Sequence, residues 1–213
     1  MKSGLGLMNR RRFALPNRFR PHHFAFDIDG VVADTMAVFV ELVRKELGIR
    51  HFSKDDIVEY ELYKCVPAPK ETIDEVLCKT LSDEYTEMIP PMPGAKEFLT
   101  RLGKLADLRF VTARVWPDSI IKWLHKLLPD IDKRRIQVVA TGDPGAKKRI
   151  LKDMGVKVFV EDRLDTCCAL RKEGFHVILF DQPWNREADG FFRIRHWKEL
   201  EKFIEWDEGA ERL

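Results

Sequence analysis

The sequence predicts an α/β protein with a doubly wound parallel sheet and a small helical cap inserted after the first strand. Three observations predict this class. Short apolar runs rich in Val, Ile and Phe recur along the chain, as expected for strands that are covered on both faces. Segments with helical periodicity lie between these runs. One long stretch, residues 35–90, interrupts the alternation and has helical patterns with no convincing strand.

The expected strands are short and nearly continuously apolar. Each is followed by a loop and then by a segment of helical period, which is typical of βαβ units. We expect strands at residues 23–28, 108–113, 136–140, 156–160 and 176–180.

The helices expected between the strands have apolar residues at helical spacing. Gly155 and Gly174 stand where two of these helices should end, each directly before a strand, as glycines commonly do at helix C-termini. We expect helices at residues 95–102, 119–128, 146–154 and 166–173.

The interrupting stretch predicts a cap over the carboxyl edge of the sheet. Residues 37–47 predict its first helix, the capping-box pattern Ser53-Lys54-Asp55-Asp56 predicts the start of a second, and residues 70–81 predict a third. The expected organisation is a basic N-terminal leader at 1–21, a core formed by 22–34 and 91–213, and a helical cap at 35–90.

Composition indicates a soluble globular chain. The 213 residues are 45% hydrophobic and 34% charged, and the formal net charge of +2 gives no argument for nucleic acid as a partner. The basic residues that precede the first acidic residue, Asp27, are interpreted as a leader, with a targeting peptide or a phosphate-rich partner as alternatives. No apolar run is long enough to cross a membrane. The four cysteines show no Cys-x-x-Cys spacing, which favours free thiols and a cytoplasmic protein.

The first strand ends in a pair of carboxylates, Asp27 and Asp29, followed by Gly30. Residues i and i+2 of an extended segment share a face, so both carboxylates can point into one site. Two neighbouring carboxylates repel each other, and a phosphate monoester would add negative charge. The pattern therefore predicts a bound Mg²⁺, whereas the alternative is an ordinary surface turn.

Polar residues also follow the second and third strands. Thr112 and Arg114 offer a hydroxyl and a positive charge near a phosphate, although a Thr at a strand end is often structural. Lys147 and Lys148 open a helix, where lysines oppose the helix dipole, so one of them is expected to have a functional role. The alternative is a solvated basic face.

The fourth strand ends in three acidic residues, Glu161, Asp162 and Asp165. Ligands of open α/β sheets bind beyond the carboxyl ends of the strands, so this group should lie near the Asp27 pair. Asp165 has a simpler interpretation as a cap of the next helix.

Taken in order, these motifs resemble those of the haloacid dehalogenase superfamily over about residues 23–205. Its pattern is Asp-x-Asp-Gly after the first strand, Ser or Thr after the second, then Lys, then an acidic pair. The resemblance implies a Rossmann-like core and a Mg²⁺-dependent phosphohydrolase. Dehalogenase members lack an Asp at the position of Asp29, so its presence favours phosphoryl chemistry.

The resemblance also implies roles for individual residues. Asp27 would be the nucleophile and a metal ligand, and Asp29 the general acid/base that reaches the metal through its backbone carbonyl. Asp162 would complete the Mg²⁺ site, with Glu161 or Asp165 assisting through water. The phosphate would be bound by Thr112, Ala113, Arg114 and Lys147, with Lys148 as the alternative lysine.

A narrower resemblance is to the deoxyribonucleotidase-like branch of 5′-nucleotidases with a small helical cap. It rests on residues 111–124, 160–163 and 180–186, followed by residues 193–197. It implies a nucleoside monophosphate as substrate. The alternatives are a sugar phosphate or another small phosphorylated metabolite, or a non-catalytic binding or regulatory protein on the same fold.

Aromatic residues give a weaker signal about the substrate. Trp184 and Trp197 are interpreted as packing residues rather than ligand-stacking residues. The aromatic residues of the cap are interpreted in the same way, as its own core, with stacking on a base as the alternative. They are Phe39, Phe52, Tyr60 and Tyr63.

Overall fold

Six parallel strands form one sheet with the order β3-β2-β1-β4-β5-β6. The structure, a computed structural model, describes residues 18–206. Strand β1 lies between β2 and β4, and the chain winds outward from it in both directions, so the switch point of the topology is at the carboxyl end of β1. The strands are β1 (Phe24–Phe26), β2 (Leu108–Thr112), β3 (Ile136–Ala140), β4 (Val158–Glu161), β5 (His176–Phe180) and β6 (Phe192–Ile194).

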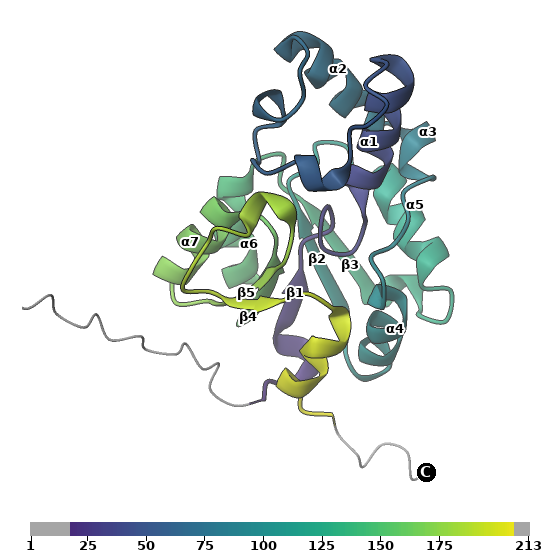
Figure 1. Ribbon diagram of the computed structural model, residues 1–213. Coiled ribbons are helices and arrows are strands. Elements are labelled where there is room, and N and C mark those ends of the chain that lie inside the picture. Colours follow the sequence, from purple (N-terminus) through teal and green to yellow (C-terminus); the bar gives the residue numbers. More distant parts are fainter. Residues whose placement is uncertain (1–17, 207–213) are drawn as a thin grey trace, which may run out of the picture.

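Helices cover both faces of this sheet, as Figure 1 shows. The α-helices are α1 (Thr35–Glu46), α2 (Lys70–Thr80), α3 (Asp83–Thr86), α4 (Ala95–Leu105), α5 (Asp118–Leu127), α6 (Lys147–Asp153) and α7 (Leu164–Lys172). Short 3-10 helices are η1 (Pro21–His23), η2 (Lys54–Asp56), η3 (Leu62–Lys64), η4 (Lys133–Arg135), η5 (Pro144–Ala146), η6 (Pro183–Asn185) and η7 (Trp197–Phe203).

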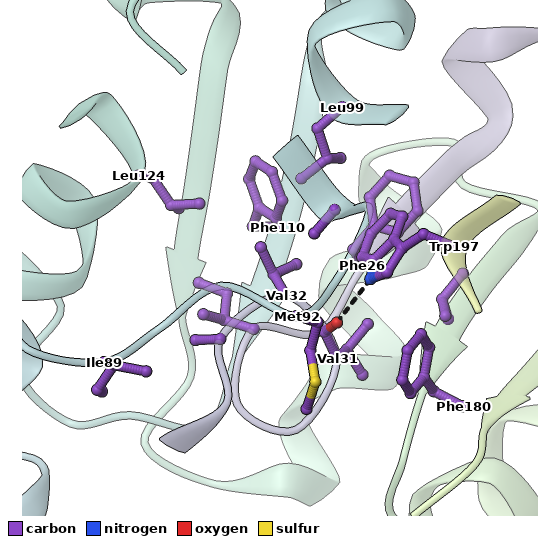
Figure 2. Close-up of a cluster of buried hydrophobic side chains, with 14 of the residues drawn as sticks. Phe26, Val31, Val32, Ile89, Met92, Leu99, Phe110, Leu124, Phe180 and Trp197 are labelled. Atoms are coloured by element: carbon purple, nitrogen blue, oxygen red, sulfur yellow. Dashed lines mark hydrogen bonds between the residues drawn. The ribbon is translucent and has the colours of Figure 1, made fainter. Parts of the chain in front are cut away.

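Alternate residues of the strands fill two separate apolar layers. Phe26 of β1 belongs to the layer under α4, α5 and η7, whereas its neighbour Ala25 belongs to the layer under α6 and α7. Trp197 is fully buried in the first layer and donates its indole N–H to the carbonyl of Val31, 3.0 Å away (Figure 2). The expectation that Trp197 is a packing residue is confirmed. It also fixes the loop that follows β1.

The helices of residues 35–86 lie above the carboxyl ends of the strands (Figure 1). The two chain segments that connect them to the core are hydrogen-bonded to each other. Asp34 N donates to Pro90 O over 2.9 Å, and Met92 N donates to Val32 O over 2.7 Å. The insertion therefore leaves and rejoins the core at adjacent points.

Most of the expected elements are present, with shifted ends. The strand expected at 23–28 stops at Phe26, because the carbonyl of Ile28 closes a turn by accepting the N–H groups of Val32 and Ala33. The helix expected at the Ser53 capping box is present as one 3-10 turn, η2, which ends at Asp56. Asp56 accepts the backbone N–H of Ser53 over 2.7 Å, as in a capping box.

Two short elements were missed in the sequence. Strand β6 and helix α3 have three and four residues, too few to display a period. The expected leader at 1–21 lies mostly outside the described residues. Among the described residues, no helix has the length and apolar character needed to span a membrane.

Candidate active site

The loop after β1 brings Asp27 and Asp29 to the carboxyl edge of the sheet. Asp27 N continues the pairing with β4 by donating to Val160 O over 2.9 Å, so its side chain has a fixed direction. Gly30 follows with a φ of 77°, in the left-handed region that favours glycine. A Cβ at Gly30 would lie 2.4 Å from Oδ2 of Asp162. Glycine is therefore required for the β1 and β4 loops to approach each other this closely.

Three carboxylates converge beside this loop. Asp27, Glu161 and Asp162 each place one carboxylate oxygen so that the three atoms lie within 4.8 Å of one another. Nζ of Lys147 lies 2.9 Å from Oδ1 of Asp27 and 2.8 Å from Oε2 of Glu161. All four side chains are buried. We name these four residues the Asp27 cluster; its formal charge is three negative against one positive.

The imbalance shows in the pKa values of the cluster. Burial, and then the charge of Glu161, raise the pKa of Asp27 well above its ordinary value. The same two causes, with Asp27 added, raise the pKa of Asp162. Burial alone would lower the pKa of Lys147, but the negative charges of Asp27 and Glu161 outweigh burial and raise it. Burial alone would raise the pKa of Glu161, but the charge of Lys147 outweighs burial and lowers it. Lys147 is therefore charged and is shared between Asp27 and Glu161, so the three carboxylates of the cluster have one positive charge among them.

Of the two candidate lysines, the structure brings Lys147 into the site. It is the first residue of α6 and its side chain is 3% exposed. Lys148 points to the surface and pairs with Glu173 at 3.0 Å.

Asp29 has different partners from Asp27. Arg114 donates from Nε to Oδ2 over 2.9 Å and from Nη2 to Oδ1 over 2.7 Å, and Thr35 donates its hydroxyl to Oδ1. The third nitrogen of the guanidinium, Nη1, donates to the hydroxyl of Thr86 over 2.9 Å. We name Asp29, Arg114, Thr35 and Thr86 the Asp29 cluster. Burial alone would raise the pKa of Asp29, but the Arg114 guanidinium and these hydrogen bonds hold it below its ordinary value.

The remaining predicted residues are also placed at this edge of the sheet. Thr112 ends β2, is 1% exposed, and its hydroxyl accepts the backbone N–H of Arg114 over 3.2 Å. Ala113 lies in the loop between them. Asp165 lies in the first turn of α7, where it pairs with Arg163 and accepts the N–H of Thr166, and it does not join the acidic cluster.

Trp184 is a site residue that the sequence did not reveal. Its indole N–H donates to Oδ2 of Asp162 over 2.9 Å. Two neighbours hold its segment: Asn185 donates to the carbonyl of Asp162 over 2.7 Å, and Gln182 donates to the carbonyl of Gly30 over 2.6 Å. The interpretation of Trp184 as a packing residue alone is incomplete. The only available signal was its position four residues beyond the carboxyl end of β5, in the Asp-Gln-Pro-Trp segment.

A cavity of about 320 Å³ lies between these loops and the cap. Tyr60 of its wall lies against the Arg163 guanidinium, whose carbon is 4.3 Å from the ring centroid. Phe39 and Phe52 are buried in the cap as expected, but Tyr63 and Tyr60 face the cavity, so the interpretation of all four as cap core is wrong for the tyrosines. On the core side the wall includes Asp29, Gly30, Asp162 and Trp184; on the cap side it includes Met36, Ile57, Leu62 and Leu77.

The donor set of the Asp27 cluster fits a hard divalent cation. Such ions prefer carboxylate oxygens, and three are available within one ion's reach. Asp27 and Asp162, whose pKa values are raised because one ammonium group does not balance three carboxylates, are the groups that a cation would neutralise. Asp29 gives its carboxylate to Arg114 instead, so any contact with a metal would come from its backbone carbonyl, as the resemblance implies.

The sequence of the chain is similar to those of known proteins. Residues 22–208 match the family model described as 5′ nucleotidase, deoxy (Pyrimidine), cytosolic type C protein. The chain is 23% identical over 180 residues to a protein named Nucleotidase from Clostridium acetobutylicum, an alignment that covers 84% of this chain and 91% of that protein.

Solved structures share the fold. A haloacid dehalogenase-like family hydrolase from Streptococcus pneumoniae superposes with a TM-score of 0.56 at 12% identity, covering 84% of this chain and 97% of that one. A haloacid dehalogenase family hydrolase from Deinococcus radiodurans, solved with bound phosphate and sodium, gives 0.55 at 14% identity, covering 84% and 93%. The chain therefore belongs to the cytosolic type C family of deoxy (pyrimidine) 5′-nucleotidases, is a phosphatase, and has the fold of haloacid dehalogenase-like hydrolases.

Proposed function

We propose that the protein is a Mg²⁺-dependent phosphomonoesterase that hydrolyses nucleoside 5′-monophosphates in the cytoplasm through an aspartyl-phosphate on Asp27. The observation that carries this proposal is the convergence of Asp27, Glu161 and Asp162 around Lys147 at the switch point of the sheet. That arrangement supplies a nucleophile, a counter-charge and a cation site at one place.

In the first step an oxygen of Asp27 attacks phosphorus and forms a P–O bond. The bond from phosphorus to the leaving oxygen breaks, and that oxygen keeps the electron pair and takes a proton from Asp29. In the second step water attacks phosphorus and gives a proton to Asp29. The bond between phosphorus and Asp27 then breaks, which releases inorganic phosphate and restores both carboxyl groups.

Positive charge must balance the phosphate during both steps. Lys147 supplies one positive charge at 2.9 Å from the nucleophile, and its burial strengthens that interaction. Asp27, Asp162 and the carbonyl of Asp29 would hold Mg²⁺, which supplies Lewis-acid stabilisation of the phosphoryl oxygens when bound. Thr112, Ala113 and Arg114 lie on the adjacent β2 loop, where the resemblance places phosphate contacts.

The cavity supports a substrate with a flat ring. Its volume of about 320 Å³ lies in the range of small-molecule sites, and Tyr60, Tyr63 and Trp184 are among the residues that line it. The name of the Clostridium acetobutylicum relative agrees with a nucleotide. The four cysteines, none of which forms a disulfide with another, agree with a reducing compartment.

The test compares Asp27→Asn with a matched control. Asp27→Asn should abolish Mg²⁺-dependent hydrolysis of an aryl phosphate and of nucleoside monophosphates, because the amide is not a nucleophile, and it should keep the circular dichroism spectrum of the wild type. Asp165→Asn is the control, since that carboxylate is 63% exposed and pairs with Arg163. Full activity of Asp27→Asn would refute the aspartyl-phosphate. Strong preference for sugar phosphates in a substrate screen would refute the nucleotidase assignment and leave the chemistry.

A further inference from the structure

We propose that Arg114 is a positioning residue that sets the direction of the Asp29 carboxylate and ties it to the cap through Thr86. This inference rests on the proposed function, because it concerns the residue proposed to protonate the leaving group. It assigns Arg114 a task other than the phosphate contact that the resemblance implies.

The first argument is the geometry of the pair. A guanidinium that meets a carboxylate with two nitrogens fixes both the position and the plane of the carboxylate. Arg114 makes this two-point contact, at 2.9 and 2.7 Å, and its side chain is only 4% exposed. A direction fixed in this way determines where Asp29 takes up a proton from water and where it releases one to the leaving oxygen, which acid–base catalysis requires.

The second argument is that each of the three nitrogens of the Arg114 guanidinium already has a partner in the protein. Nε and Nη2 contact Asp29, and Nη1 contacts the hydroxyl of Thr86 over 2.9 Å. The guanidinium contributes no atom to the wall of the cavity. A residue whose three nitrogens are engaged with protein groups acts on the reaction through those groups.

The third argument is where the partners come from. Thr35, the third contact of Asp29, is the first residue of α1, with which the helical insertion begins. Thr86 is the last residue of α3, with which it ends, and is fully buried. Its hydroxyl is oriented by donating to Leu81 O over 3.3 Å, which leaves it as the acceptor for Arg114. Both ends of the insertion are thereby connected to one catalytic carboxylate.

In this arrangement the direction of the Asp29 side chain depends on the position of the cap relative to the core. Movement of α3 relative to the core would withdraw the acceptor of Nη1, and movement of α1 would withdraw Thr35. Either change removes a contact that holds the direction of Asp29. The structure thus assigns to the Asp29 cluster a coupling between cap position and leaving-group protonation.

The experiment measures how strongly the rate depends on the leaving group. Wild-type enzyme, Arg114→Lys and Arg114→Gln are assayed in Mg²⁺ with a nucleoside 5′-monophosphate, whose alkoxide needs a proton, and with 2,4-dinitrophenyl phosphate, whose leaving group needs none. Since general acid catalysis contributes roughly 10²- to 10⁴-fold, kcat of Arg114→Gln should fall by about 10²-fold on the nucleotide and by less than about threefold on the aryl ester. Arg114→Lys keeps the positive charge but cannot contact both oxygens of Asp29 with two nitrogens. It should show the same selective loss to a smaller degree.

Equal losses on both substrates, with a raised KM and weaker inhibition by inorganic phosphate, would overturn the inference and make Arg114 a phosphate ligand. Thr86→Val provides the test through the cap and is compared with Thr86→Ser, which keeps the hydroxyl. Thr86→Val should lower kcat on the nucleotide selectively, and Thr86→Ser should match the wild type. Identical behaviour of the two variants would contradict the connection to the cap.

Two further measurements separate this inference from the proposed function. In the background of Asp29→Asn, Arg114→Gln should have little additional effect on either substrate, because the group that it positions is already lost. A crystal structure of Arg114→Gln should show the Asp29 carboxylate in a new orientation; an unchanged orientation would refute the inference even if the enzyme proved inactive. Failure of the wild type to hydrolyse any phosphomonoester would refute the proposed function instead.

Discussion

The Asp27 cluster and the Asp29 cluster are built around two aspartates that are two positions apart in the sequence. They differ in how their charges are balanced. The Asp27 cluster holds three buried carboxylates and one ammonium group, all from the core. The Asp29 cluster holds one carboxylate and one guanidinium, together with hydroxyls from both ends of the insertion. The first cluster has too little positive charge to balance its carboxylates and therefore fits a bound cation. The second is neutral and complete within the protein, so it can serve to hold a side chain in place.

The largest effect on stability and activity should come from removing Lys147, the one positively charged side chain of the Asp27 cluster. Lys147→Met leaves buried carboxylates without their partner, which should lower the free energy of unfolding by about 3–5 kcal/mol and abolish hydrolysis. Lys148→Met is the matched control. Its side chain is 48% exposed and pairs with Glu173, so its loss should cost less than about 1 kcal/mol. Urea denaturation in EDTA measures both values, and equal losses would contradict the distinction between the two lysines.

The next effect is stabilisation by Mg²⁺. At a concentration one hundred times its dissociation constant, Mg²⁺ should raise the free energy of unfolding of the wild type by about 2.7 kcal/mol. Asp162→Asn should lose most of this gain. Asp29→Asn should keep it, because the substitution leaves the backbone carbonyl of residue 29 in place and the Asp29 carboxylate binds Arg114 rather than the metal. Thermal denaturation with and without Mg²⁺ gives the comparison. The reverse ranking of the two variants would show that the cation site lies around Asp29.

The two clusters should also give opposite pH dependence in EDTA. Asp27 and Asp162 have raised pKa values, so between the unfolded value of 3.8 and the folded values the native state binds more protons, and stability falls as pH rises. Each group contributes a slope of up to about 1.4 kcal/mol per pH unit. Asp29 has a lowered pKa, so its contribution is present above 3.8 and is lost as pH falls through the folded value.

Asp162→Asn should therefore flatten the decline of stability above pH 4. Asp29→Asn should leave that decline in place and instead reduce the loss of stability on acidification below pH 4. The free energy of unfolding in urea, measured from pH 3 to pH 8, checks both variants. Identical slopes of the metal-free wild type and Asp162→Asn between pH 4 and pH 7 would contradict the pKa direction given for Asp162.

The smallest effect concerns the hydrogen bond from Trp184 to Asp162. Trp184→Phe keeps the aromatic surface and removes the indole donor, which should weaken Mg²⁺ binding by about tenfold, as is usual when a partner of a metal ligand is lost. Trp197→Phe removes the equivalent donor from Val31 O in the apolar core. It should lower stability without changing the dissociation constant of Mg²⁺. Calorimetric titration with Mg²⁺ measures both, and equal affinities of Trp184→Phe and wild type would contradict a supporting role for Trp184.

The sequence was sufficient to predict the residues that converge at the sheet edge. Asp27, Thr112 and Asp162 directly follow or end apolar strands, and parallel strands present such ends at one edge. Lys147 was identified less certainly, because a helix start with two lysines does not show which of them points inward. The burial of Lys147 and the exposure of Lys148 settle that question only once α6 is packed on the sheet.

The partners of these residues could not be predicted from spacing. Arg114 and Asp29 are separated by 85 positions, and their pairing depends on how the β2 loop turns back across the end of β1. The contact from Trp184 to Asp162 depends on the turn at η6, which is fixed by the hydrogen bonds of Gln182 and Asn185. Periodicity identifies strands and their ends, but loop conformation and side-chain direction decide which polar groups meet.

The pairing of the two connecting segments has a consequence for how such proteins can diversify. Backbone hydrogen bonds hold residues 32–34 and 90–92 side by side. The insertion is therefore joined to the core chain at two neighbouring points, whatever the length of chain between them. Replacing the intervening module with a longer or shorter one adds little closure entropy, since that cost grows only slowly with loop length. The hydrolytic machinery and the surface that selects its substrate can therefore change at independent rates, apart from Thr35 and Thr86, which any transplanted module would have to supply.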